Sequence, residues 1–262
     1  GDPDMPDDDG EYGPAPLNGE QEARYSGIMD EWVWVAQAKM FYRRRDSMMF
    51  DTKSFDSMFN YMLEGKGSIS TEIFGAKRSM RKFDKMDFLP EQPEFCGEVY
   101  NTWRPSDLNP AEGDPTIFLE HMDYMFEDER ERNLVLDYMA WGVQNPAEKP
   151  NFAMVIKGKQ GTGKSFIGQV LERIFGPHNT GRPMNASIQS QFNGWARNVK
   201  LVVIEELMVR GRVDLMNHLK PMITDPLIEI NEKYQPAQKI TNNCVIVAFT
   251  NHDDALPVED DD

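Results

Sequence analysis

The sequence has few cysteines and no long apolar run. Cys96 and Cys244 are its only two cysteines, too few for a disulfide framework or a zinc site, so a reducing compartment is the expected setting. No apolar stretch approaches the length that crosses a membrane, and the N-terminus carries no signal-peptide pattern, so we predict no membrane segment. Residue 1 is glycine rather than methionine, and we expect the chain to be a piece of a longer polypeptide.

Positive charge is also scarce. The chain has 28 Lys and Arg against 44 Asp and Glu, a net charge of −16 at pH 7, which excludes a protein that coats nucleic acid with a uniformly basic surface. The acids are unevenly placed, because residues 1–20 and 253–262 hold thirteen of them and no Lys or Arg. Residues 21–252 carry a net charge of only −3, and a local basic channel in that body is compatible with the composition.

The composition along the chain predicts three segments. Residues 1–22 are acidic and rich in Pro and Gly, which is typical of a disordered lead-in. Residues 23–112 are expected to form a smaller accessory module, mostly helical or mixed α/β. Pro, Gly and Asn are frequent over 91–115, which indicates a long connection, and we place the module boundary near residue 112. Residues 113–262 carry the motifs described below.

Within the accessory module, 32–35 is strand-like, and Phe55, Met58, Phe59 and Met62 follow the spacing of an amphipathic helix with Asp51 as its N-cap. Such a Met and Phe stripe is more often core than a cofactor site.

Two short stretches of the module are basic: residues 43–45 and 76–82. They are either a solvated face, which we favour slightly, or a contact with a DNA backbone.

Residues 158–165 read Gly-Lys-Gln-Gly-Thr-Gly-Lys-Ser and match the P-loop pattern G-x-x-x-x-G-K-[ST]. A strand is predicted before them over 152–157 and a helix after them up to Phe175, the context that this motif needs. The glycines let backbone N–H groups surround phosphate oxygens. Lys164 would reach the β- and γ-phosphates of ATP, and the Ser165 hydroxyl would hold Mg²⁺. The residues assigned to nucleotide binding are Gly158, Lys159, Gln160, Gly161, Thr162, Gly163, Lys164, Ser165 and Phe166.

Residues 201–206 place four apolar side chains before Glu205 and Glu206, the Walker B pattern of a buried strand that ends in carboxylates. Next to a P-loop, one carboxylate would help hold Mg²⁺ and the other would activate the attacking water. We assign Glu205 mainly to the metal and Glu206 mainly to the water. The sequence supports the presence of both roles better than it supports which acid has which role.

Residues 244–251 form another apolar run and end in Thr250 and Asn251. A lone Asn after a strand is usually a turn residue. As the third motif in this series, Asn251 is assigned a catalytic role, sensing the γ-phosphate or the attacking water. The three motifs predict an α/β fold, a parallel sheet flanked by helices, with helices also expected over 115–126 and 129–144.

Residues 228–230 and 238–241 are expected to pair as a hairpin with Lys233 and Tyr234 near its tip. A cation beside an aromatic ring at a loop tip suits a nucleic-acid strand, although a solvated turn explains the local sequence equally well. Lys233 and Tyr234 are the candidate DNA-binding residues.

The order of these motifs resembles that of the superfamily 3 helicases of the AAA+ class, and most closely the helicase part of phage and plasmid primase-helicases. The resemblance is specific over about 115–257 and looser over 23–112. It rests on residues 138–146, 158–165, 192–195, 201–206, 219–240 and 245–251.

The resemblance implies an ATP hydrolase that uses ATP and Mg²⁺ and moves on single-stranded DNA as a ring, as a hexamer in the full-length protein. A primase or polymerase module upstream is implied as a partner, and the cytoplasm, of the host cell if the protein is viral, as the location. The arginine finger of the family would lie beyond residue 262, with Arg210 and Arg212 as weaker substitutes. Weak or absent hydrolysis is therefore expected of this fragment.

Two functions of different classes remain open. One is a helicase motor, and the other is an ATP-gated ring-assembly or loading module without unwinding activity. A small-molecule kinase is disfavoured, because no lid-like Arg-rich segment follows the P-loop helix.

Overall fold

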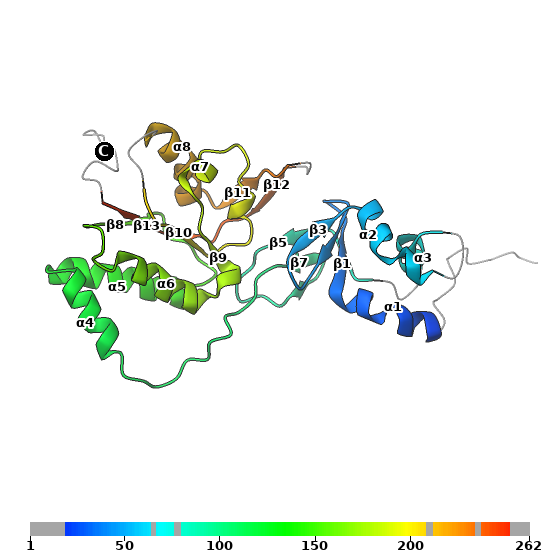
Figure 1. The fold of residues 1–262 in the computed structure, drawn as a ribbon, viewed down its shortest axis with the longest axis horizontal. Coiled ribbons are helices and arrows are strands. Elements are labelled where there is room, and N and C mark those ends of the chain that lie inside the picture. Colours follow the sequence, from blue (N-terminus) through cyan, green and yellow to red (C-terminus); the bar gives the residue numbers. More distant parts are fainter. Residues whose placement is uncertain (1–18, 64–66, 76–79, 208–211, 234–236, 252–262) are drawn as a thin grey trace, which may run out of the picture. The chain divides into compact units, whose positions relative to one another are not determined.

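The computed structural model describes residues 19–63, 67–75, 80–207, 212–233 and 237–251. The chain divides into two compact units, unit 1 over Gly1–Lys85 and unit 2 over Met86–Asp262 (Figure 1). A disordered lead-in is expected over 1–22. Residues 1–18 lie outside the described residues, whereas residues 19–22 belong to the first helix.

Unit 1 combines a sheet with helices, so the expectation of a mostly helical module is corrected to mixed α/β. Its sheet has the order β3-β2-β1-β4, in which β1 is antiparallel to β2 and parallel to β4. The strands form because aromatic and β-branched residues such as Trp32 and Val33 lie buried on them. Its elements are α1 (Gly19–Glu31), β1 (Trp32–Val35), β2 (Met40–Arg43), β3 (Met48–Phe50), α2 (Thr52–Phe59), η1 (Asn60–Met62), α3 (Ile69–Gly75) and β4 (Lys82–Phe83).

Helix α2 begins as predicted, because the Asp51 carboxylate accepts a 2.7 Å hydrogen bond from the Ser54 backbone N–H. Phe55 is fully buried and stacks on Phe41 with ring centroids 3.8 Å apart. The aromatic stripe of α2 is therefore core, as its spacing predicts.

The basic run at 43–45 makes its contacts inside unit 1. Arg43 pairs with Asp46 at 2.7 Å and lies 5.3 Å from the ring centroid of Trp32. Arg45 pairs with Glu31 at 3.0 Å. These contacts favour a solvated structural face over a DNA contact for this run.

The first part of unit 2 is a small three-stranded sheet with the order β5-β7-β6, where the sequence predicts only a connection. Its strands are β5 (Lys85–Asp87), β6 (Phe95–Cys96) and β7 (Val99–Asn101). Asp87 Oδ1 accepts a 2.9 Å hydrogen bond from Thr241 N–H, and Asn243 Nδ2 donates to Phe88 O at 3.1 Å. These bonds tie the small sheet to unit 2, so the division lies at 85/86 rather than near residue 112.

The larger sheet of unit 2 is parallel throughout, as predicted, and has the strand order β8-β13-β10-β9. Every residue of β10 and β13 is buried, as expected of strands covered on both faces. The strands are β8 (Met154–Lys157), β9 (Thr180–Gly181), β10 (Leu201–Ile204) and β13 (Val245–Thr250). Among the described residues, no helix has both the length and the apolar character needed to cross a membrane.

Helices cover both faces of this sheet (Figure 1). Val202 and Ile204 pack toward α7 (Asn185–Ile188), α8 (Arg212–Thr224) and the hairpin of β11 (Leu227–Ile230) with β12 (Gln238–Thr241). Leu201 and Val203 pack toward the other face, which is covered by three helices. These are α4 (Thr116–Met125), α5 (Glu129–Gln144) and α6 (Lys164–Phe175), all close to their predicted bounds. Two 3₁₀ turns, η2 (Pro177–Asn179) and η3 (Gly194–Ala196), complete the unit.

Candidate functional site

A cavity of about 540 Å³ opens where β8, β10 and β13 end. Because all three strands are parallel, their carboxyl ends meet at one edge, which is where open α/β sheets place their ligands. The structure therefore brings most of the predicted site residues to one place. The cavity is lined by Gln160, Gly161, Gly163, Lys164, Ser165, Glu205, Glu206, Phe249, Thr250 and Asn251.

The glycine-rich loop between β8 and α6 owes its shape to two glycines. Gly161 and Gly163 have φ of +82° and +94°, in the region that side chains rarely adopt. A β-carbon on Gly163 would also lie 2.4 Å from His121 Cε1 of helix α4. The imidazole of His121 packs edge-on against Phe166, with ring centroids 4.9 Å apart. Sequence reasoning missed this contact, because a single His on a predicted helix carries no signal for it.

Lys164 lies at the first position of α6, and its ammonium group is turned onto the loop. It donates hydrogen bonds to the carbonyl oxygens of Gly158 at 2.5 Å and Lys159 at 2.6 Å. Helix α6 lies close to the sheet, since a β-carbon on Gly168 would be 3.0 Å from Val203 Cγ1. The sheet thus fixes the start of α6, where Lys164 and the following serine face the cavity.

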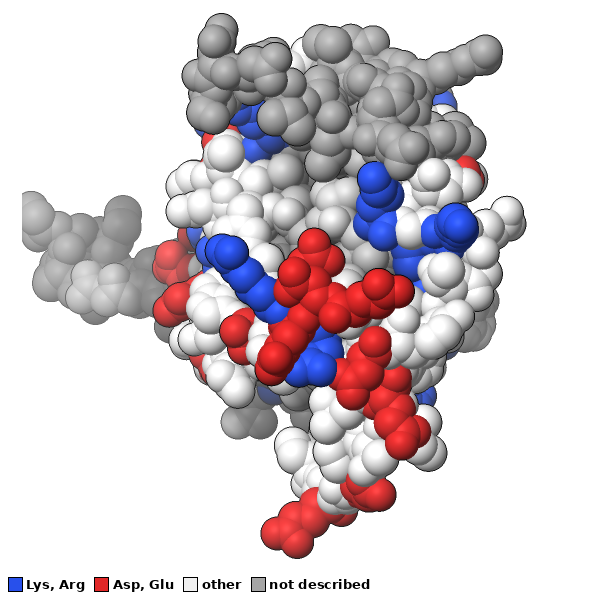
Figure 2. Space-filling model, turned by 90° about the vertical axis from the view of Figure 1, so that its left-hand side faces the viewer, with Lys and Arg blue, Asp and Glu red and all other residues white. Residues whose placement is uncertain are grey.

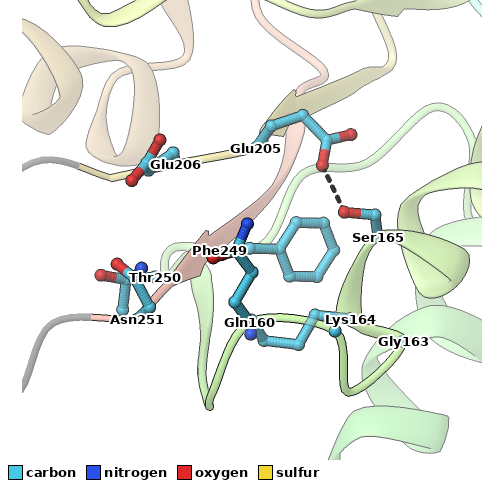
Figure 3. Close-up of a pocket in the computed structure, with 10 residues that line it drawn as sticks. Gln160, Gly163, Lys164, Ser165, Glu205, Glu206, Phe249, Thr250 and Asn251 are labelled. Carbon is cyan, nitrogen blue, oxygen red and sulfur yellow. Dashed lines mark hydrogen bonds between the residues drawn. The ribbon is translucent and has the colours of Figure 1, made fainter.

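Glu205 and Glu206 follow β10 and enter the cavity in different directions. Glu205 Oε2 accepts a 2.7 Å hydrogen bond from Ser165 Oγ, whereas Glu206 lies away from Ser165, toward Asn251 (Figure 3). The chain after β10 is held beside β13, because Leu207 N–H donates to Phe249 O at 2.8 Å. One acid is therefore next to the loop serine and the other is across the cavity.

Arg182, just after β9, is a further member of the site that sequence reasoning missed. Its Nε and Nη2 donate to Glu172 Oε2 of α6 at 3.0 and 2.6 Å, and its Nη1 contacts Glu205 Oε1. Burial lowers the pKa of Arg182, but the hydrogen bonds and charges of Glu172 and Glu205 raise it by more, so its guanidinium stays charged. An isolated arginine after a two-residue strand gives no recognisable pattern in one sequence.

A second cavity, of about 670 Å³, also borders the glycine-rich loop. It shares Lys164 with the first cavity and also contains the predicted loop residues Gly158 and Thr162. Neither cavity lining includes Lys159 or Phe166. The remaining lining is mostly aromatic and aliphatic, with two acids and one lysine: Tyr124, Met125, Phe126, Glu127, Glu131, Leu134, Val135, Tyr138, Phe152, Met154, Val155, Ile156 and Lys157.

The predicted hairpin is confirmed, because β11 and β12 pair antiparallel, and Lys233 follows β11. Lys233 is exposed, is not part of the lining of either cavity described above, and its Nζ lies 5.5 Å from the ring centroid of Phe192. Tyr234 and Arg210 lie outside the described residues. Arg212 begins α8, but its side chain is not described.

Comparisons with known proteins match this chain to a family model and to a phage protein. Residues 156–262 match a family described as a "Family of unknown function (DUF5906)". The chain is 30% identical over 181 residues to the "DNA Primase-polymerase" of Nitratiruptor phage NrS-1, a match that covers 66% of this chain and 25% of that protein. This chain thus corresponds to about a quarter of its curated relative.

Solved structures of the NrS-1 C terminal region share the fold. An apo structure of its residues 305–718 matches with a TM-score of 0.72 at 22% identity, over 94% of this chain and 61% of that one. An A form apo structure of the same region matches with a TM-score of 0.71 at 23% identity, over 91% and 59%. At these identities the likeness concerns the mixed α/β fold.

Proposed function

We propose that unit 2 is an ATP-hydrolysing motor of a phage-like replication protein that couples hydrolysis to movement along single-stranded DNA. The observation that carries this proposal is the contact between Ser165 and Glu205 inside the cavity. A Mg²⁺–nucleotide site needs a hydroxyl at the start of the loop helix and a carboxylate at the end of the neighbouring buried strand. The fold brings these two groups within one hydrogen bond, from positions 40 residues apart.

The residues present fit a Mg²⁺–ATP complex. Mg²⁺ usually keeps only one or two protein carboxylates and takes its other ligands from phosphates and water. Within the described ranges no three His, Cys, Asp or Glu side chains form a metal-binding group, so the phosphates would supply the missing ligands. Ser165 and Glu205 would hold the ion, which neutralises charge on the β- and γ-phosphate oxygens.

The remaining cavity residues have complementary roles in the proposal. Lys164 would exchange its two loop carbonyls for phosphate oxygens, since an anion is the stronger partner for an ammonium group. Glu206, which lies away from Ser165, would accept a proton from an attacking water. Asn251 would orient that water or the γ-phosphate through its amide.

The second cavity would take the base of the nucleotide. It begins at the same loop and is lined by Tyr124, Phe126 and Phe152, and aromatic rings suit the flat face of a nucleobase. The ring of Phe152 is held 5.2 Å from that of Tyr138. Tyr138 is anchored in turn, because its hydroxyl donates a 3.0 Å hydrogen bond to Ile246 O.

The surface charge restricts where DNA is bound. Figure 2 shows that Asp and Glu outnumber Lys and Arg over the centre and lower part of the face around the α4–α5 connection. The end of α4, the connection and the first turn of α5 together contain the exposed acids Asp123, Glu127, Asp128, Glu129 and Glu131. Phosphates are repelled there. The hairpin of β11 and β12 covers the other face of the sheet and bears Lys233 after β11, so it is the proposed DNA contact.

A ring of subunits, as a hexamer of the AAA+ and superfamily 3 type, completes the proposal. The ring rests on the resemblance of the motifs, and the parallel sheet with helices on both faces is compatible with it. Light scattering on this chain, with and without Mg²⁺ and a non-hydrolysable ATP analogue, is the test. The proposal predicts a nucleotide-dependent change from a single chain to a ring-sized species, and a single chain under both conditions contradicts ring assembly by this segment.

A further inference from the structure

Arg182 connects the helix that follows the glycine-rich loop to the acid at the end of β10. Its Nε and Nη2 donate to Glu172 Oε2 at 3.0 and 2.6 Å, and its Nη1 contacts Glu205 Oε1. Glu172 is in α6 and Glu205 follows β10, so a single guanidinium joins these two parts of the site from its place after β9.

Both oxygens of the Glu205 carboxylate are engaged in this arrangement. Oε2 accepts the hydrogen bond from Ser165 Oγ, and Oε1 contacts Arg182. The two groups that the proposed function assigns to Mg²⁺ are therefore bonded to each other. The negative charge that would attract the ion is balanced by a guanidinium in direct contact with it.

Arg182 can exchange its carboxylate partners for other anions. The side chains of Arg182 and Glu205 are 30% and 44% exposed, and ion pairs this accessible to water contribute little net stability. A guanidinium binds phosphate oxygens with the same planar geometry as carboxylate oxygens. A phosphate chain in the cavity would therefore offer Arg182 another anionic partner and release Glu205.

We propose that Arg182 is a positioning residue that keeps Glu205 bonded to protein groups, so that a divalent cation enters this site only together with nucleotide phosphates. This inference rests on the proposed function, in which Glu205 is a metal ligand. It adds a form of regulation, since the free protein would not collect Mg²⁺ at Glu205 and Ser165 before a nucleotide arrives.

The test is divalent-cation binding by the nucleotide-free protein, measured with Mn²⁺ by electron paramagnetic resonance. The wild-type chain should show no saturable Mn²⁺ site that Glu205→Gln removes. Arg182→Ala should create one such site, at least tenfold tighter than any wild-type binding, and the double variant with Glu205→Gln should lose it. Arg182→Lys keeps a cation and should behave like the wild type.

Two controls separate positioning from general charge or folding effects. Arg173→Ala removes an exposed arginine from the same helix as Glu172 and should leave Mn²⁺ binding unchanged. Circular dichroism should show equal helix content for all variants. If Arg182→Ala misfolds, Arg182→Gln, which keeps a polar side chain but removes the positive charge beside Glu205, should still raise Mn²⁺ affinity.

The inference is overturned if folded Arg182→Ala binds Mn²⁺ no better than the wild type, or if Arg173→Ala produces the same gain. Because the measurement contains no nucleotide, its outcome is independent of whether the chain binds ATP. A failure of the proposed function would instead appear as the absence of any nucleotide binding that depends on Lys164.

Discussion

Ser165 Oγ donates a 2.7 Å hydrogen bond to Glu205 Oε2, which joins the first turn of α6 to the end of β10. Glu206, the next residue, lies away from Ser165 and toward Asn251 (Figure 3). Two adjacent acids therefore occupy different parts of one cavity. This geometry is compatible with the different roles assigned to them, a metal ligand and a base, and it makes the two roles separable by experiment.

Glu205→Gln should weaken the Mg²⁺ dependence of nucleotide binding, because it removes a charged ligand of the ion. Glu206→Gln should leave Mg²⁺-dependent binding within about twofold of the wild type, because a base acts on water rather than on the ion. Titration of a fluorescent ATP analogue at several Mg²⁺ concentrations measures both effects. Equal losses in the two variants would contradict the separation of roles.

The role of Glu206 is tested in a form of the protein that hydrolyses ATP. There Glu206→Gln should bind ATP and reduce turnover by about 10²-fold or more, the usual contribution of a general base. Turnover close to the wild-type rate would contradict the assignment of Glu206 as the base.

Phe152→Ala should weaken ATP binding and spare the binding of a bare phosphate chain. Loss of one stacking ring costs roughly 1–3 kcal/mol, or about 5- to 150-fold in affinity. Tripolyphosphate has no base, so calorimetry should give the same affinity for the variant and the wild type. Leu227→Ala, an exposed apolar residue on the hairpin, is the matched control. Equal losses for ATP and tripolyphosphate would show that Phe152 does not contact the base.

Lys233→Ala should leave ATP binding intact and weaken binding of single-stranded DNA several-fold, because every subunit of the proposed ring loses a cation that faces the DNA. Lys239 is an exposed lysine of the same hairpin, opposite Glu229 on β11, so Lys239→Ala is the matched control. Fluorescence anisotropy with a labelled oligonucleotide measures both. A silent Lys233→Ala favours the ring-assembly or loading module over the motor.

Lys200 predicts a pH dependence of stability. Its side chain is completely buried, and its ammonium group donates to Glu148 O at 2.6 Å. Burial lowers the pKa of Lys200 to about 8, while the charges of Cys244, Glu148 and Glu91 raise it only in part. The unfolded chain keeps an ordinary lysine pKa of about 10.4. Between these values the unfolded state binds the extra proton, so stability should rise with pH, by about 3 kcal/mol at most.

Cys244 acts in the opposite direction and must be removed for this measurement. Burial raises the pKa of its thiol to about 12, so stability is lost as pH rises from about 9 toward that value. Urea unfolding should therefore compare Cys244→Ala with Cys244→Ala/Lys200→Met at pH 7 to 10. Above pH 8, the unfolding free energy of Cys244→Ala should rise relative to that of Cys244→Ala/Lys200→Met. Parallel pH profiles would contradict the lowered pKa.

The central sheet and its cavity could be predicted because their signals are local. Continuous apolar runs marked β10 and β13, and a fixed glycine spacing marked the loop between β8 and α6. The small sheet of β5, β6 and β7 could not be predicted, since strands of two or three residues carry no periodicity. It depends on long-range hydrogen bonds such as the one from Thr241 N–H to Asp87. Contacts between residues far apart in the sequence also decide where the two units divide. The boundary therefore lies at 85/86 and not near residue 112.

The site residues also divide into those with a local sequence signal and those that only long-range contacts reveal. Lys164, Ser165 and the two acids belong to motifs and were predicted together. Arg182 was missed because only the folded chain shows that it contacts Glu205. Phe166 was assigned to nucleotide binding from its position beside the loop, but it packs on His121 instead of lining either cavity.

Calorimetric titration of this chain with Mg²⁺ and a non-hydrolysable ATP analogue, beside Lys164→Ala and Lys159→Ala, decides whether the glycine-rich loop binds a nucleotide. Both lysines were assigned to nucleotide binding from the loop motif, but only Lys164 lines the cavity, so the side chain of Lys159 is not expected to contact the nucleotide. We expect one binding site per chain, unchanged in Lys159→Ala and weakened roughly 10- to 100-fold in Lys164→Ala, the loss expected for one charged hydrogen bond. No binding by the wild-type chain, or equal binding by all three proteins, would contradict it.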